Sequence, residues 1–284
     1  MMILFKKIND LRNYLDSQRK IGNKIGFVPT MGALHDGHLS LITGSKKENQ
    51  VTVCSIFVNP AQFNDPKDFE KYPITTDRDI ALLEPAGCEV LFLPSVTEIY
   101  PAGPGGGQHY DLGYLETLLE GKYRPGHFQG VCKVVHRLLD IVRPDNLYLG
   151  QKDYQQCMVI SRLLEITGLG RHTTIHICPT LREKDGLAMS SRNMRLNETE
   201  RKQAVTIYQC LQHIKTSLKP GHTTSLILEA TQTLEKAGFK PDYVAIADAF
   251  TLEPVEHWDG RQDIVALIAA YLNEVRLIDN LSIT

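Results

Sequence analysis

Roughly the first 180 residues alternate short apolar runs with segments of helical periodicity. Five runs are strand-like, and most are apolar at consecutive positions, as expected for strands covered on both faces. They lie at residues 24–30, 51–59, 89–95, 146–150 and 173–179. Helical candidates lie between them, at about residues 38–48, 76–86, 130–142 and 154–167. Strands that alternate with helices predict an α/β fold with a Rossmann-like, doubly wound parallel sheet.

The pattern changes after about residue 180. Asn197 and Glu200 match a helix N-cap and its capping partner, and they open a long helix that "LKPGH" (218–222) breaks. Residues 223–238 supply a second helix. Three strand-like runs follow, "DYVAIAD", "DIVALIAAYL" and "EVRLIDNL", with no room for helices between the last two. We therefore expect an antiparallel sheet there.

These patterns predict two domains. A Rossmann-like domain spans residues 1–181, and a smaller α+β domain spans residues 182–284, with the join near "LREKDG". A chain of 284 residues, with 42% hydrophobic and 23% charged residues, can bury the cores of two such domains.

Charge and cysteine usage narrow the class of protein. The formal net charge of −2 gives no electrostatic footprint for nucleic acid or an anionic membrane, so we expect neither partner, and an anionic substrate must be held locally. The N-terminus, "MMILFKKINDLRNYL", has neither the apolar core of a signal peptide nor the length of a membrane span. Six scattered cysteines without a C-x-x-C pair favour free thiols. We therefore predict a cytoplasmic protein.

Two histidines, His35 and His38, follow the first strand-like run in "FVPTMGALHDGHL" (27–39). Ligands of an open parallel sheet bind beyond the carboxyl ends of its strands, where a helix start directs N–H groups and a positive dipole end at them. Gly37 lets the backbone pass close to such a ligand. A nucleotide phosphate is the natural occupant.

Other interpretations of the histidines stay open on this motif alone. A zinc site would need a third ligand and usually a catalytic carboxylate, and no H-E-x-x-H follows. The histidines could instead cap or pack a helix end. A dinucleotide site is disfavoured because no G-x-G-x-x-G turn follows this strand.

Two later segments favour a triphosphate. "YLGQKDYQQ" (148–156) places Lys152 and Asp153 after another apolar strand, and "DGLAMSSRN" (185–193) carries Ser190, Ser191 and Arg192. Each segment alone is ordinary, since such lysines are often solvated and Ser-Ser-Arg is often a turn. Together they supply the ammonium, guanidinium and hydroxyl donors that a triphosphate requires.

The H-x-G-H element and the later "AMSSR" resemble the signatures of the class I aminoacyl-tRNA synthetase and nucleotidyltransferase superfamily. Within it, the chain resembles the pantothenate synthetase (pantoate–β-alanine ligase) family. The resemblance rests on "PTMGALHDGH", "SIFVNPAQF", "YRPGHFQGV", "GQKDYQQ" and "DGLAMSSRN", in this order, with "RLIDN" near the end. Two departures are Ala61, where the family has a larger residue, and Ile74, where it often has arginine.

This resemblance implies an ATP-dependent ligation in two steps. The pantoate carboxylate attacks the α-phosphorus of Mg-ATP to give pantoyl adenylate and pyrophosphate, and the amine of β-alanine then displaces AMP to give pantothenate. ATP and Mg²⁺ are implied as cofactors and a homodimer as the assembly. A different nucleotidyltransferase of the superfamily, or a non-catalytic nucleotide-binding protein, remains an alternative.

The resemblance also assigns residues. His38 matches the family's proton donor, with His35, Lys152 and Arg192 as the other catalytic candidates. The ATP-binding candidates are Met31, Gly32, Ala33, Leu34, His35, Asp36, Gly37, His38, Gly150, Gln151, Lys152, Asp153, Leu181, Met189, Ser190, Ser191 and Arg192. The candidates for pantoate and β-alanine are Gln62, Gln156, Asn59 and Arg124. Protein ligands of Mg²⁺ stay open, with Asp79 as a residue to test. Loops 63–73 and 100–110 are hypothesised to move over the site.

Overall fold

The computed structural model describes residues 1–63, 69–106 and 108–283 and divides the chain into two compact units. Unit 1 comprises Met1–Gln151 and Gln155–Pro179, and unit 2 comprises Lys152–Tyr154 and Thr180–Thr284. The main division therefore lies close to the boundary that the sequence predicts. The short segment 152–154 groups with unit 2, which the sequence does not indicate.

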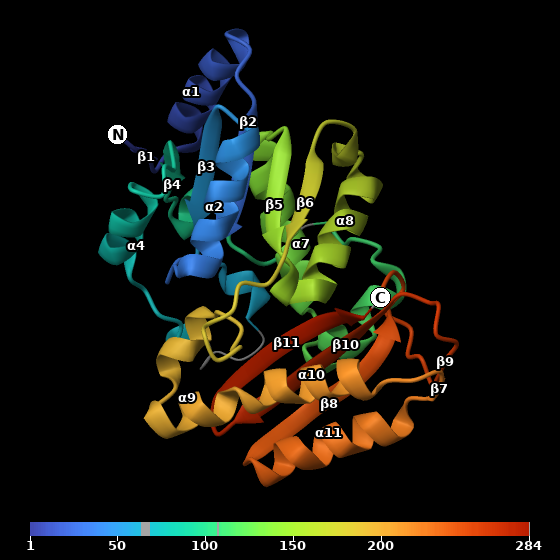
Figure 1. Cartoon of the computed structure of the whole chain (residues 1–284). Helices are drawn as coiled ribbons and strands as arrows, with labels where there is room; N and C mark the ends of the chain where they lie inside the picture. Colours follow the sequence, from blue (N-terminus) through green and yellow to red (C-terminus); the bar gives the residue numbers. More distant parts are fainter. Residues whose placement is uncertain (64–68, 107, 284) are drawn as a thin grey trace. The chain divides into compact units, whose positions relative to one another are not determined.

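Unit 1 is built on a parallel sheet (Figure 1). Its described strands are β1 (Ile3–Phe5), β2 (Ile25–Thr30), β3 (Val51–Ile56), β4 (Val90–Phe92), β5 (Asn146–Gly150) and β6 (Thr174–Cys178). Their order is β1-β4-β3-β2-β5-β6, and every pairing between them is parallel. The predicted doubly wound α/β sheet is confirmed. β1 is an addition, because three residues are too short a run to show a period.

Helices cover both faces of this sheet. The helical segments described in this part of the chain are α1 (Ile8–Lys20), α2 (Asp36–Glu48), η1 (Pro60–Gln62), α4 (Thr76–Leu83), α5 (Val96–Ile99), η2 (Gly113–Glu116), α6 (Leu119–Tyr123), α7 (His127–Val142), η3 (Gln151–Asp153), α8 (Tyr154–Thr167) and η4 (Leu169–Arg171). The end of η3 and the first residue of α8 belong to unit 2 by contact. Figure 1 shows α2 in front of the sheet and α7 behind it, and both helices contact β2.

The centre of the sheet is the point where the strand order reverses. β3 lies on one side of β2 and β5 on the other. The ladder between β2 and β5 pairs Gly26 with Asn146 and Phe27 with Leu147, whereas the ladder between β2 and β3 runs the full length of both strands. The carboxyl ends of β2 and β5 thus lie at a topological switch point, where open α/β sheets bind their ligands.

Unit 2 is a smaller α+β unit. Its elements are η5 (Ser191–Arg195), α9 (Glu198–Ala204), α10 (Thr206–Ser217), α11 (Thr224–Lys236), β7 (Gly221–His222), β8 (Phe239–Asp248), β9 (His257–Trp258), β10 (Ile264–Leu272) and β11 (Val275–Ile283). β10 pairs antiparallel with β8 and β11, as predicted. The predicted capping box of Asn197 and Glu200 is present. The single long helix predicted after it is divided into α9 and α10 at Val205.

Each unit has its own apolar core. In unit 1, buried side chains of β2, β3 and β4 meet those of α2 and α4, among them Val28, Ile42 and Leu83. In unit 2, α10 and α11 cover one face of the β8-β10-β11 sheet. Among the residues described, no helix combines the length and apolar character that crossing a membrane requires.

Candidate functional site

A tight turn joins β2 to α2, and Asp79 of α4 holds it. The Asp79 carboxylate accepts the backbone N–H groups of Ala33 at 3.0 Å and Leu34 at 2.8 Å, and the Thr75 hydroxyl at 3.0 Å. Its residue is only 1% exposed. Gly32 and Ala33 have φ values of +81° and +50°, in the left-handed region that disfavours most side chains. The two backbone hydrogen bonds therefore stabilise a turn with unfavourable backbone angles.

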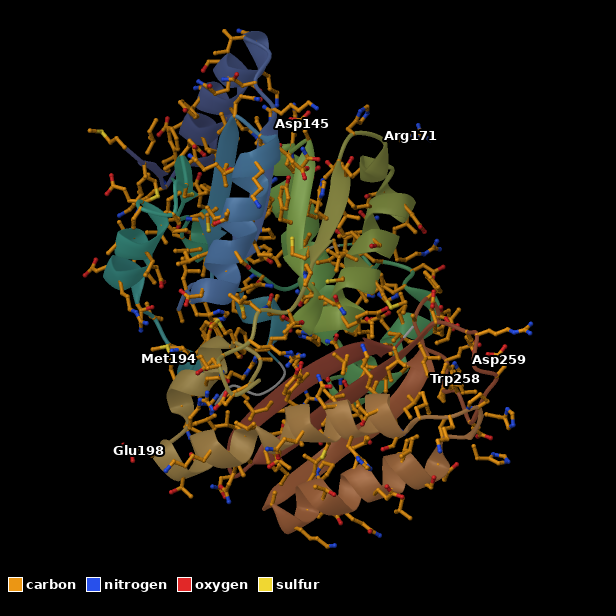
Figure 2. The ribbon with its side chains drawn as sticks, in the orientation of Figure 1. Asp145, Arg171, Met194, Glu198, Trp258 and Asp259 are labelled. Carbon is orange, nitrogen blue, oxygen red and sulfur yellow. The ribbon has the colours of Figure 1, made fainter. Side chains whose placement is uncertain are left out.

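This turn places the two histidines at the start of α2. The helix begins at Asp36, two residues before its predicted start, so His35 is its N-cap residue and His38 lies in its first turn. The two rings are neighbours, with centroids 4.1 Å apart and an interplanar angle of 39°. Two imidazoles beside a helix N-terminus at the carboxyl end of β2 are suited to bind an anion. Asp145 and Arg171, labelled in Figure 2, lie at the opposite edge of this sheet.

The structure brings an ATP candidate and a pantoate candidate together. The amide of Gln62 in η1 donates to the sulfur of Met31 at 2.7 Å. His127 Nδ1 lies 2.7 Å from the backbone carbonyl of Gln62, so this nitrogen carries the proton and donates. Met31 precedes the histidine turn, and Gln62 follows β3. Both therefore lie beyond the carboxyl ends of adjacent strands, β2 and β3.

Asn59 holds the side chain of Gln62 by a hydrogen bond. Its side chain donates to Gln62 Oε1 at 3.2 Å and to the Gly130 carbonyl at 3.1 Å, and it accepts from Ala61 N at 3.2 Å and from the Tyr100 hydroxyl at 3.0 Å. Asn59 is 1% exposed. Because these four contacts use both donor hydrogens and both acceptor lone pairs of the Asn59 amide, whereas the Gln62 amide donates once and accepts once, Asn59 suits holding Gln62 better than binding a substrate directly.

The two neighbouring glutamines of α8 have different surroundings. Gln155 is 3% exposed, and its side chain bonds to the carbonyls of Leu115 and Leu118 and to the N–H of Glu120. Gln156 is only partly buried. Gln155 thus has a structural role in holding residues 115–120, and Gln156 stays the candidate for substrate binding. Arg124, the remaining substrate candidate, lies 3.5 Å from Glu120.

Unit 2 carries the other candidate segments. Gly150 ends β5 in unit 1, whereas Lys152 and Asp153 belong to unit 2. The Lys152 ammonium lies 3.8 Å from the Asp153 carboxylate, and its side chain is 16% exposed. The amide of Asn280 in β11 donates to the Lys152 carbonyl at 2.8 Å. The lysine is therefore held through its backbone, while its side chain keeps access to solvent.

The Ser-Ser-Arg loop follows a short hairpin. Leu181 and Met189 are hydrogen-bonded across it, and Arg182 pairs with Ala188. Ser190 is the N-cap of η5, and its hydroxyl oxygen accepts from the Arg192 N–H at 3.3 Å. A hydroxyl that accepts in a cap still has its own proton to donate, so Ser190 remains a donor for phosphate. Ser191 is buried at 7% exposure and Arg192 is half-buried.

Sequence reasoning missed the residues that hold these segments. The sequence suggests Asp79 only as a residue to test for Mg²⁺ binding, yet both of its oxygens accept hydrogen bonds from the protein. The sequence assigns no role to Arg182, Asp279 or Asn280, although the last two lie in "RLIDN". The available signal was an adjacent Asp and Asn in the middle of a strand whose neighbouring positions on both sides are apolar. Among the residues described, no cluster of three or more His, Cys, Asp or Glu side chains could hold a metal ion.

The two loops predicted to move over the site, 63–73 and 100–110, are only partly described by the structure. Residues 64–68 and 107 lie outside the described residues, so the proposed motion of loops 63–73 and 100–110 stays a prediction. The described end of the second loop is tied down. Gln129 bonds to both the N–H and the carbonyl of Tyr110, and the Tyr110 hydroxyl lies 2.8 Å from His136 Nδ1.

Three features together define the class of protein as a nucleotide-using α/β enzyme. They are an open parallel sheet, a pair of histidines on a helix N-terminus at its switch point, and a second unit with a lysine and a Ser-Ser-Arg loop. Comparison with known proteins makes this specific. The family model described as pantoate–β-alanine ligase matches residues 3–282. The pantothenate synthetase of Cytophaga hutchinsonii is 45% identical over 285 residues, which cover 99% of both chains.

Solved structures agree. The crystal structure of pantothenate synthetase from Thermus thermophilus matches with a TM-score of 0.86 and 39% identity, over 99% of each chain. That of the Francisella tularensis pantoate–β-alanine ligase, complexed with β,γ-ATP and β-alanine, matches with a TM-score of 0.84 and 40% identity, over 99% of this chain and 97% of that one. The chain belongs to the pantoate–β-alanine ligase family. It is an enzyme, a ligase that joins pantoate to β-alanine.

Proposed function

We propose that the ligation runs through a pantoyl adenylate and that the residues described above carry it. ATP is the energy source, in line with the relative that binds β,γ-ATP and β-alanine. In the first step a pantoate carboxylate oxygen bonds to the α-phosphorus, and the bond from that phosphorus to the pyrophosphate oxygen breaks. In the second step the β-alanine amine attacks the acyl carbon, AMP leaves, and the amine loses a proton.

The observation that carries the proposal is the braced turn of unit 1. Asp79 fixes Ala33 and Leu34, and this places His35 and His38 beside the N-terminus of α2. Preorganised N–H donors stabilise charge that develops at phosphorus without rearranging during the reaction. His38 is the proposed proton donor and His35 its partner. Residues 31–38 contact ATP in this proposal, together with Gly150 and Gln151.

Pantoate is assigned to the glutamines. Gln62 is held by Asn59 and lies against Met31, so it can orient the pantoate carboxylate and hydroxyls beside the nucleotide. A glutamine donates and accepts at once, which suits a substrate carrying both groups. Gln156 is the second pantoate residue. Asn59 acts through Gln62, and Arg124 is a further substrate candidate.

In unit 2, Lys152, Ser190, Ser191 and Arg192 are proposed to bind the phosphates and the departing pyrophosphate, with Asp153, Leu181 and Met189 nearby in the chain. Cationic and hydroxyl donors match phosphate oxygens. Mg²⁺ is proposed to enter as Mg-ATP, as part of the substrate. This is consistent with the lack of an acidic metal-binding cluster among the described residues and with the occupied oxygens of Asp79.

The deciding experiment is exchange of labelled pyrophosphate into ATP in the presence of pantoate and the absence of β-alanine. We expect pantoate-dependent exchange, which unrelated carboxylates do not support. His38→Ala should slow it by about 10² to 10³, the loss typical of removing one transition-state donor. A change of tenfold or less with folding preserved would return the histidines to a structural role. Exchange that is independent of pantoate would refute the substrate assignment.

Assembly and location are further proposals. A homodimer rests on the family resemblance, and size-exclusion chromatography with light scattering tests it. A cytoplasmic location is supported by the six cysteines, all free thiols. Thiols persist in reducing compartments.

A further inference from the structure

Asp279 and Asn280 are adjacent polar residues on β11. Successive side chains of a strand point to opposite faces of the sheet. Asp279 shares its face with Leu277 and Ile283, which belong to the apolar core of unit 2, and with Leu281, which is partly buried and packs against that core. Both polar residues are buried, at 5% and 3% exposure. Burying a carboxylate in an apolar face costs desolvation free energy unless the carboxylate is paired, so the partner of Asp279 indicates its role.

The partner of Asp279 is Arg182, at the base of the hairpin that leads to the Ser-Ser-Arg loop. Arg182 binds the carboxylate through two nitrogens, at 2.6 and 3.0 Å. The same guanidinium donates to the Gly186 and Asn280 carbonyls, each at 3.1 Å, and lies 4.2 Å from the centre of the Tyr208 ring. Burial raises the pKa of Asp279, and the Arg182 guanidinium opposes that rise. The hairpin is therefore attached to β11 by a fixed, bidentate contact.

Asn280 holds the other segment. Its amide donates to the Lys152 carbonyl at 2.8 Å, across a sequence separation of 128 residues. The same segment is fixed a second time, because the Tyr154 hydroxyl donates to the Ala249 carbonyl at 2.7 Å. Residues 152–154 thus belong to unit 2 although they follow β5 in the chain.

We infer that Asp279 and Asn280 are positioning residues that hold the two phosphate-binding segments of unit 2 in one geometry. Asp279 acts through Arg182 on the Ser190–Arg192 loop, and Asn280 acts on Lys152. This inference rests on the proposed role of those segments in binding ATP phosphates. Two flexible cationic segments bind a triphosphate well only when their spacing is set beforehand, because ordering them on binding would cost free energy.

The first test asks whether Asn280 acts through Lys152. Pantoate-dependent pyrophosphate exchange is measured against ATP concentration for the unaltered enzyme, Asn280→Leu, Lys152→Ala and the double variant. We expect Asn280→Leu to slow exchange by about 10 to 10²-fold, as for a small misplacement of a catalytic group. The double variant should be no slower than Lys152→Ala, because residues acting as one unit are not additive. Asn280→Ala is the second variant if the leucine impairs folding.

The outcomes separate the inference from the proposed function. The inference would be overturned if the losses in exchange rate caused by the two substitutions multiplied in the double variant. It would also be overturned if Asn280→Leu exchanged at a rate within twofold of the unaltered enzyme. Neither outcome would affect the ligase reaction itself. Absence of exchange in the unaltered enzyme would overturn the proposed adenylation and the inference with it. If Lys152→Ala exchanges normally, the assignment of Lys152 fails, and the role of Asn280 fails too.

The second test uses a matched ion pair in the same sheet. Arg276 and Asp242 join β11 to β8 at 2.7 Å, with side chains 13% and 16% exposed. Asp279→Asn and Asp242→Asn should both lower the thermal midpoint, but only Asp279→Asn should also reduce exchange by about tenfold or more. Arg182→Lys, which keeps the charge and loses the bidentate fork, serves if Asp279→Asn does not fold. Equal exchange in the Asp279 and Asp242 variants would leave the pair a structural one and refute the inference.

Discussion

At the scale of single residues, the buried carboxylate of Asp79 holds the turn that leads to the candidate histidines. It accepts hydrogen bonds from the backbone N–H groups of Ala33 and Leu34, which lie 46 and 45 residues earlier in the chain. Ala33 has a left-handed backbone conformation, and Leu34 follows it directly. A carboxylate has two oxygens that accept, whereas an amide has one acceptor and one donor. The turn at Gly32–Leu34 therefore depends on a side chain whose two terminal oxygens both accept hydrogen bonds.

Asp79→Asn should retain the fold and impair the reaction. One of the two backbone N–H groups would face an amide N–H₂ instead of an acceptor, so we expect a loss of about 1–3 kcal/mol in stability. His35 and His38 would lose their fixed position, and exchange should fall by about tenfold or more. Thermal unfolding and pyrophosphate exchange measure the two effects. If Asp79 instead bound Mg²⁺, raising the Mg²⁺ concentration would rescue the variant; we expect no rescue.

At the scale of elements, the closest packing at the candidate pantoate site is between α7 and η1. A Cβ added to Gly130 would lie 2.1 Å from the Ala61 carbonyl oxygen and 2.8 Å from Gln62 Cα. The Gly130 carbonyl also accepts from Asn59. Glycine at this position therefore allows the helix to approach the turn that presents Gln62.

Gly130→Ala should push η1 away from α7. We expect a loss of about 1–3 kcal/mol in stability, as for overpacking, and a raised KM for pantoate with a smaller change in the KM for ATP. Gly44→Ala in α2 is the matched control, since the nearest atom to its Cβ would be 3.9 Å away. That variant should be neutral or more stable by about 0.5–1 kcal/mol. Equal kinetic effects of the two substitutions would contradict the predicted role of the α7–η1 contact.

Salt bridges from α9 also hold the hairpin of unit 2 that precedes the Ser-Ser-Arg loop. Arg201 of α9 donates to Asp185 at 2.9 and 3.1 Å and to Glu183 at 2.6 Å. The hydrogen bond from Arg201 lowers the pKa of Asp185 below its ordinary value. An acid with a lowered folded pKa contributes stability above its unfolded pKa, and this contribution is lost as the pH falls through the folded pKa.

The Arg201→Met variant should therefore be less stable than the unaltered enzyme at pH 7, and the difference should shrink as the pH falls below the ordinary Asp pKa of 3.8 toward the lower pKa of folded Asp185. The effect should not exceed about 1 kcal/mol, because the Asp185 side chain is 47% exposed and solvent screens the pair. Chemical denaturation at pH 7 and pH 3 measures it. Arg162→Met, from the exposed pair with Glu165, is the control. A difference that grows on acidification would contradict the assignment.

At the scale of the whole molecule, the cysteine thiols are distributed through both units, and most of them have a low reactivity. Burial raises the pKa of five of them, to about 12 for Cys88 and Cys132 and to about 11 for Cys210, and upward also for Cys54 and Cys178. Because the thiolate is the reactive form, these cysteines are poor nucleophiles in the folded protein at neutral pH.

The folded enzyme should therefore react slowly with iodoacetamide at pH 7, and the reaction should accelerate on unfolding in guanidinium. Mass spectrometry of alkylated protein counts the modified thiols, and pyrophosphate exchange before and after treatment reports activity. Activity should survive treatment of the folded enzyme. Rapid loss of exchange with a single modified cysteine would show that the reaction depends on a thiol that the proposed mechanism does not use.

The sequence by itself determined the parallel sheet, the antiparallel C-terminal sheet and the segments proposed to bind the nucleotide. These features are local or periodic: apolar runs record burial on both faces of a strand, and the position of His35 and His38 after a strand places them at its carboxyl end. The break at Val205 and the early start of α2 shift boundaries without changing the fold.

Only the tertiary structure decided what holds those segments in place. Asp79 meets residues 33 and 34 from α4, Gln155 rather than Gln156 is occupied by the protein, and Asn280 meets Lys152 from the last strand. Each contact joins positions tens of residues apart or more, or distinguishes two identical neighbouring side chains. A sequence pattern records which residues are polar. Which backbone group a buried polar side chain reaches depends on how the elements pack, because the hydrogen bond exists only once both partners are brought within about 3 Å.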